Sequence, residues 1–439
     1  MILKHCVSMI LLGVFLAGCE SRATDANHKG LTSEFASNDD PRLIYSNIAS
    51  DSWNEIFSAL FTREFQTQVS DEFAEKGPFA EEDQGITVST RTFSVLENGD
   101  RAIEPLYPSF FNIQGVQQAL TEPAYSHLTN ALVRALAEET SRTVIAKALM
   151  QADIWAAHDI LFARKTFPKE SSQLLGQRRE ALLSLLSRFL KRLRLSPEEI
   201  ESLPRTYDLA STCHDLPNVF AHKSGWIEFH TTQLRSHDVA ADLRRSARVF
   251  LKPEVNFGDQ QRLFENLRDQ NLLAFVNSVV LVTQNLLLDN SNRVVPTQLT
   301  TTVQIRRFIR NAAGDIIDTE IQQFELSRKS LLSNSRDGGL IENGETAAYF
   351  LPSACNDFSF ASPQFKRRGP TYPVRVRLRQ RCEACHGRGA RGIFTLSRFM
   401  AEKASVGPAL EHGHGWAVAA EKRNREDFKA LINTIQMDY

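Results

Sequence analysis

Residues 275–309 read FVNSVVLVTQNLLLDNSNRVVPTQLTTTVQIRRFI, and this stretch decides how the second half of the chain folds. Two runs in it, Phe275–Leu287 and Val294–Ile309, are rich in β-branched residues and alternate in polarity, which is typical of strands. The polar residues Asp289-Asn290-Ser291-Asn292 between them predict a hairpin connection. Pro296 indicates that its strand starts there or lies at a sheet edge, because proline donates no backbone hydrogen bond.

The strand pattern continues on both sides of this hairpin. Val249–Leu251 and Glu320–Leu326 have the same composition, and Asn311–Asp315, which contains Gly314, separates the next pair of runs. Connections this short join antiparallel neighbours. We therefore predict a β-rich domain over residues 206–370, an antiparallel sandwich or meander rather than a parallel sheet.

Upstream of residue 206 the apolar residues recur at helical spacing, which predicts a helical domain over residues 46–205 that starts near Asp51. The clearest helix is Gln177–Leu195. One of its faces is apolar, with Leu182, Leu186, Phe189, Leu190 and Leu193, and arginines and lysines occupy the other faces. Such a basic amphipathic helix either packs on its neighbours or lies on a membrane. The fold class expected for the whole chain is α+β, with a small C-terminal segment over residues 371–439.

Composition and charge exclude some functions. The 439 residues carry a formal net charge of −1, which argues against general nucleic-acid binding. No later apolar stretch approaches the length of a membrane-spanning helix, so any membrane attachment is expected from the N-terminus.

The N-terminus has the pattern of an export signal, expected over residues 1–18. Lys4 precedes the apolar run Val7–Leu16, which is too short to span a bilayer. The run ends in Leu16-Ala17-Gly18-Cys19, which resembles the lipobox of bacterial lipoproteins. That resemblance implies cleavage before Cys19 and acylation of Cys19 by two or three chains, enough for a stable anchor. The alternative is an ordinary signal peptide with an unrelated cysteine.

Residues 19–45 are expected to form the lipid anchor and a flexible tether, because they are polar and almost free of large apolar side chains. Residue 20 is Glu and not the Asp that commonly retains lipoproteins in the inner membrane. The resemblance therefore implies an outer-membrane protein that faces the periplasm or the exterior.

The residues Cys382-Glu383-Ala384-Cys385-His386 read C-x-x-C-H, the attachment signature of a c-type haem. Two thiols at this spacing can each add to one haem vinyl group, and the histidine beside them can supply the proximal iron ligand. The sequence thus predicts one covalent haem c held by Cys382, Cys385 and His386. The alternatives are a disulfide loop, half of a zinc site or chance.

The approach to this motif departs from small cytochromes c, which place a helix before it. Val374, Val376 and Leu378 alternate with arginines at 375, 377 and 379, which is strand periodicity. Residues 366–398 contain ten Lys or Arg and one acid, Glu383. This basic surface could pair with haem propionates, steer an acidic redox partner or be a solvated strand face.

For two features, the sixth iron ligand and the role of the other cysteines, the sequence leaves alternatives. The sixth iron ligand could be Met400, His412, His414 or a side chain from another domain, such as His237, or the sixth position could be open. The other cysteines, Cys213 and Cys355, are expected to form a disulfide in an oxidising compartment. The competing interpretation is a zinc site that joins them to Cys382 and Cys385.

The layout is similar to a group of uncharacterised bacterial lipoproteins with a helical first half, a β-rich second half and one C-x-x-C-H near the end. The part that carries this likeness is Cys385-His386-Gly387 followed by Gly392-Ile393 and Ser397. The leading hypothesis is a lipid-anchored, monohaem, cytochrome c-like protein that transfers electrons to or from a redox partner protein. The alternatives are a haem-dependent oxidoreductase with a substrate bound upstream, and a structural lipoprotein whose C-x-x-C is a disulfide. We find no G-x-S-x-G, H-E-x-x-H or P-loop motif.

Overall fold

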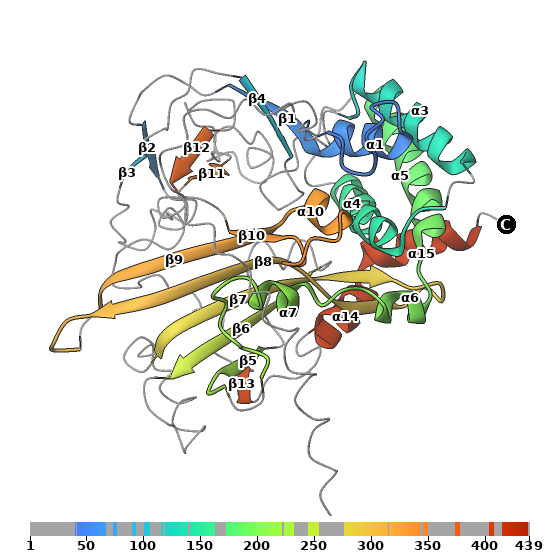
Figure 1. Cartoon of the computed structure of the whole chain (residues 1–439). Coiled ribbons are helices and arrows are strands. Elements are labelled where there is room, and N and C mark those ends of the chain that lie inside the picture. The colour runs from blue at the N-terminus through green and yellow to red at the C-terminus, as the bar shows by residue number, and fades with distance from the viewer. Residues whose placement is uncertain are drawn as a thin grey trace, which may run out of the picture.

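The computed structural model confirms the α+β class (Figure 1). Helices make up most of the N-terminal half, an antiparallel sheet follows, and two helices end the chain. The structure describes residues 40, 42–66, 73–76, 90–93, 101–105, 116, 119–138, 141–162, 173–221, 224–231, 245–253, 276–314, 316–342, 346–349, 374–377, 404–407 and 415–437.

Within these residues the main sheet has seven strands in the order β10-β9-β8-β7-β6-β5-β13, and every pair is antiparallel. Its strands are β5 (Ile227–Thr231), β6 (Arg245–Pro253), β7 (Val276–Leu288), β8 (Val294–Arg310), β9 (Ile316–Leu326), β10 (Leu340–Glu342) and β13 (Ala404–Gly407). Strands β5 to β10 follow one another as a meander, as predicted. Strand β13 comes from the far end of the chain and pairs with β5 at the edge.

The predicted hairpin joins β7 to β8. The Asp289 carboxylate accepts hydrogen bonds from the N–H groups of Ser291 (2.9 Å) and Arg293 (2.7 Å), and Asn292 takes a positive φ of 62°. Strand β9 pairs with β8 only from Thr302 onward, so at Pro296 β8 has a strand neighbour on one side, β7. The edge position expected for this proline is confirmed.

The helices gather at one end of the sheet (Figure 1). They are α1 (Ser52–Phe61), α3 (Ala124–Ala137), α4 (Val144–Phe162), α5 (Gln173–Leu193), α6 (Pro197–Glu201), α7 (Thr206–Ser211), α10 (Arg328–Leu332), α14 (Gly415–Asn424) and α15 (Glu426–Met437). Asp51 caps α1 by accepting from the N–H of Trp53. The apolar face of α5 is buried in the helical core, which favours the packing interpretation over a membrane surface.

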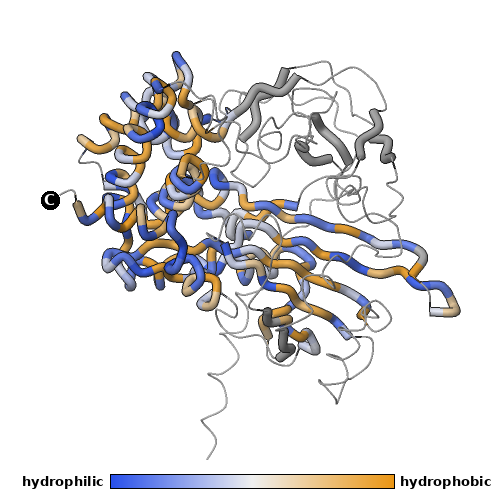
Figure 2. Tube along the Cα trace, turned by 180° about the vertical axis from the view of Figure 1, so that it is seen from behind, coloured by the Kyte–Doolittle hydropathy of each residue, from blue (hydrophilic) through white to orange (hydrophobic). Residues whose placement is uncertain are grey.

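Short two-stranded sheets complete the described elements. They pair β1 (Thr62–Gln66) with β4 (Arg101–Pro105), β2 (Phe73–Lys76) with β3 (Thr90–Phe93), and β11 (Thr346–Tyr349) with β12 (Val374–Arg377). Hydrophobic and hydrophilic positions alternate along the long strands of the main sheet (Figure 2). None of the helices that the structure describes is both long and apolar enough to cross a membrane.

Two apolar clusters form the core, and α4 contributes to both. Met150 belongs to the helical cluster, whereas Leu149 packs with the strands. The fully buried Gln151 fixes α4 between the two parts: its amide donates to the carbonyls of Leu193 (3.0 Å) and Leu288 (2.9 Å) and accepts from the Leu288 N–H (2.7 Å). Buried amides need such partners, so this residue sets the position of the helix against the sheet.

Candidate functional site

The residues expected to hold haem lie outside the described part of the chain. This applies to Cys382, Cys385 and His386, to the sixth-ligand candidates Met400, His412, His414 and His237, and to Cys19 and Cys355. Their chemistry fits a covalent haem, since it supplies two thiols for the vinyl groups and one imidazole for the iron. The haem attachment, the axial ligand and the lipid anchor stay predictions.

The structure does describe the strands before and after the haem motif. The predicted strand appears as β12, which pairs with β11 in the register Tyr349↔Val374 and Thr346↔Arg377. After the motif the chain enters β13, which pairs with β5 in the register Ala404↔Thr231 and Gly407↔Glu228. The segment with the motif therefore runs from a two-stranded ribbon to an edge of the main sheet, and hydrogen-bonded strands fix both ends.

The first helix after this segment, α14, packs closely on the sheet. Its first residue, Gly415, is buried against Pro296 of β8, and a Cβ added to Gly415 would lie 2.7 Å from the Pro296 Cβ. Real Cβ atoms do not approach this closely, so only glycine fits. His412 and His414 directly precede this glycine in the sequence. The stretch of chain that contains these two histidines therefore joins α14 at a residue whose position is set by packing on Pro296.

Farther along α14, Lys422 lies at the centre of a charged group, which we call the Lys422 cluster: the buried Lys422, Asp159 and Asp427, and the partly exposed Arg425 at its rim. The ammonium of Lys422 donates to Asp159 of α4 (2.6 Å) and to Asp427 of α15 (3.1 Å), and its side chain is 1% exposed. Asp427 also binds Arg425 at 3.2 Å. Two carboxylates and two cations balance in charge, which a low-dielectric site requires.

Two aromatic side chains of α4 adjoin the Lys422 cluster. The ammonium lies 5.5 Å from the ring centre of Trp155, within the range of a cation–π contact. His158 is 2% exposed, stacks on Phe162 and has its Nδ1 at 3.6 Å from Asp159. The Nε1 of Trp155 and the Nδ1 of His158 are buried without a hydrogen-bond partner among the described residues.

The chemistry of the Lys422 cluster is that of a structural ion group. Among the described residues, no set of three or more His, Cys, Asp or Glu side chains is placed to hold a metal ion. The cluster ties α14 and α15 to α4, and so it fixes the end of the chain that leaves the haem motif.

A second buried ion pair lies beside β13, the described strand that follows the C-x-x-C-H motif. Arg248 of β6 and Glu228 of β5 form two hydrogen bonds of 2.8 and 2.7 Å, and both side chains are 0% exposed. The guanidinium also lies over Phe220 at 4.7 Å and Phe250 at 5.3 Å. Because Glu228 is the pairing position opposite Gly407 of β13, this ion pair stabilises the strand that β13 joins.

No family model matches the chain, and no curated protein or solved structure was found to be similar to it. The functional assignment therefore depends on the residues themselves.

Sequence reasoning found the haem motif and the β12 strand but missed the two buried ion groups. Lys422 and Asp159 are 263 residues apart, and Arg248 and Glu228 belong to different strands. One local signal existed. Lys422 and Asp427 occur within a short run of mostly charged residues, Glu421–Asp427, that sequence reading takes as a solvated helix face.

Proposed function

We propose that this protein is a lipid-anchored, monohaem c-type protein that transfers electrons at the periplasmic or outer face of a bacterial outer membrane. The observation that carries the proposal is Cys382-Glu383-Ala384-Cys385-His386 in a chain that begins with an export signal. Haem c supplies one-electron exchange when it is bound. The protein supplies the thiols, the axial imidazole and the membrane tether.

Attachment needs no further reactant. Each thiol, Cys382 and Cys385, would add across a vinyl C=C bond: sulfur bonds to one carbon and the proton goes to the other. The imidazole of His386 would then be the proximal ligand, because the short spacing leaves it beside the attached macrocycle. Anchored strands on both sides, β12 and β13, support a segment whose ends are held in place.

The basic residues around the motif support an acidic redox partner. Arg375 and Arg377 belong to β12, and Arg379 lies two residues after its end. Positive surface near a redox centre raises the encounter rate with an acidic carrier, and salt screens the attraction. Electron exchange should therefore slow as ionic strength rises. Replacing the three arginines with glutamine should flatten that salt dependence, whereas an unchanged slope would argue against this docking surface.

The first experiment tests the haem. The full chain, expressed with haem-attachment machinery, should keep haem through denaturing electrophoresis, and Cys385→Ser should release it or leave a single thioether. The matched control is Cys213→Ser, which removes a cysteine outside the motif and should retain haem. A colourless band with unmodified Cys382 and Cys385 by mass spectrometry would refute the proposal and favour the disulfide alternative.

The ferric spectrum separates electron transfer from catalysis. A carrier with two protein ligands gives a low-spin ferric haem that resists cyanide. A high-spin form that binds cyanide readily and turns over peroxide would support the oxidoreductase alternative.

The second experiment tests the anchor. Cys19→Ser should leave the precursor unprocessed or move the protein out of the membrane fraction, because lipid attachment would occur at this thiol. Unchanged processing and fractionation would show that the protein has no lipid anchor at this residue.

A further inference from the structure

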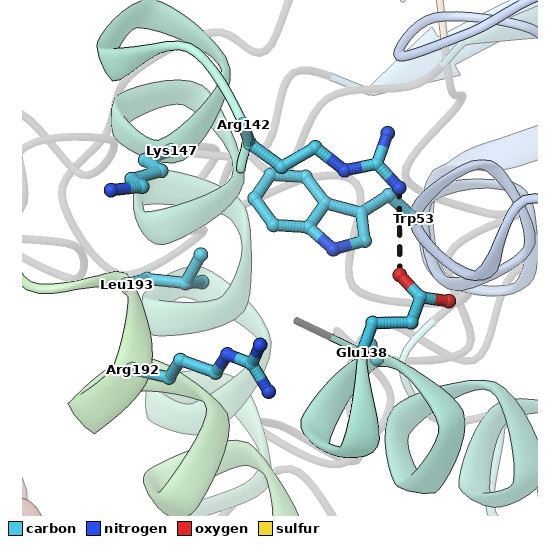
Figure 3. Close-up of a pocket in the computed structure, with 7 residues that line it drawn as sticks. Trp53, Glu138, Arg142, Lys147, Arg192 and Leu193 are labelled. Carbon is cyan, nitrogen blue, oxygen red and sulfur yellow. Dashed lines mark ion pairs between the residues drawn. The ribbon is translucent and has the colours of Figure 1, made fainter. Parts of the chain in front are cut away.

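We draw no further inference here: the strongest candidate, the small recess beside Trp53 where α3 and α5 end (Figure 3), offers a ligand no apolar wall, because Trp53 and Leu193 are 5% and 1% exposed and Arg142 covers the indole, and nothing in the described part of the chain points to a ligand there.

Discussion

Replacing Lys422 with methionine tests how strongly the terminal helices are held to the helical core. Methionine keeps most of the apolar stem but removes the ammonium that binds Asp159 and Asp427. Asp427 keeps Arg425 and the Phe428 N–H as partners. Asp159, which is 7% exposed, loses the 2.6 Å hydrogen bond from the Lys422 ammonium. The main cost therefore falls on one buried carboxylate.

Removing one partner of a buried ion pair costs about 3–5 kcal/mol, and we expect Lys422→Met to lower the free energy of unfolding by that amount. Adding Asp159→Asn in the same chain removes the buried negative charge that faced the ammonium and should restore at least about 2 kcal/mol of the loss. The matched control is Lys429→Met on α15. Lys429 is 53% exposed and pairs with the exposed Glu426, so its loss should cost less than about 1 kcal/mol.

Urea unfolding followed by circular dichroism measures these differences, and hydrogen exchange of α14 and α15 shows whether the loss is local. Exchange in these two helices should increase more than in β7 and β8, because the sheet keeps its own hydrogen bonds. A loss no greater than that of Lys429→Met, or no recovery in the double variant, would refute the role assigned to the Lys422 cluster.

Three further predictions concern other described residues. Gly415→Ala should destabilise the protein by about 1–3 kcal/mol because its Cβ would meet Pro296, whereas Gly176→Ala in α5, which has nothing within 4 Å, should stabilise it slightly; thermal melts compare the two. The pKa of Asp51 is lowered in the folded protein, so its carboxylate stabilises the fold above the ordinary pKa of 3.8, and this stability is lost as the pH falls through the lower pKa of the folded state. Asp51→Asn lacks this carboxylate and should therefore lose less stability than the wild type between about pH 5 and pH 2 in urea titrations. Cys213 and Cys355 should appear as one disulfide-linked peptide pair in non-reducing mapping, and two alkylated thiols would exclude the bridge.

The sequence predicted the β-meander well because its signals are local. The run of β-branched residues in β7 and β8, the polar turn at Asp289 and the break at Pro296 act over a few residues each. The helix start at Asp51 was equally local, since a cap depends on the next three residues. The long-range return of β13 to β5 had no such signal, because a short strand at a sheet edge needs little pattern of its own.

The features of the candidate site also divide into those with a local sequence signal and those without one. The C-x-x-C-H motif is visible because haem attachment would require this spacing of Cys382, Cys385 and His386. The ion groups at Lys422 and Arg248 depend on which helices and strands meet, and no single segment contains enough of either. Arginines and lysines on helices and strands read as solvated positions, so only the tertiary contacts show that Lys422 and Arg248 are buried.

The terminal helices α14 and α15 also join the C-terminal segment to the core of the protein. Val418, Phe428, Leu431 and Ile435 are buried in the same apolar cluster as α4 and α5. A chain cut before residue 371 would lose these side chains and expose the core that they cover, at about 1.5–3 kcal/mol for each large apolar residue. The motif from Cys382 to His386 thus belongs to a segment that leaves the body at β12 and returns to it twice, at β13 and at α14. A truncation that removes the motif therefore also removes β13 from the sheet edge and α14 and α15 from the core.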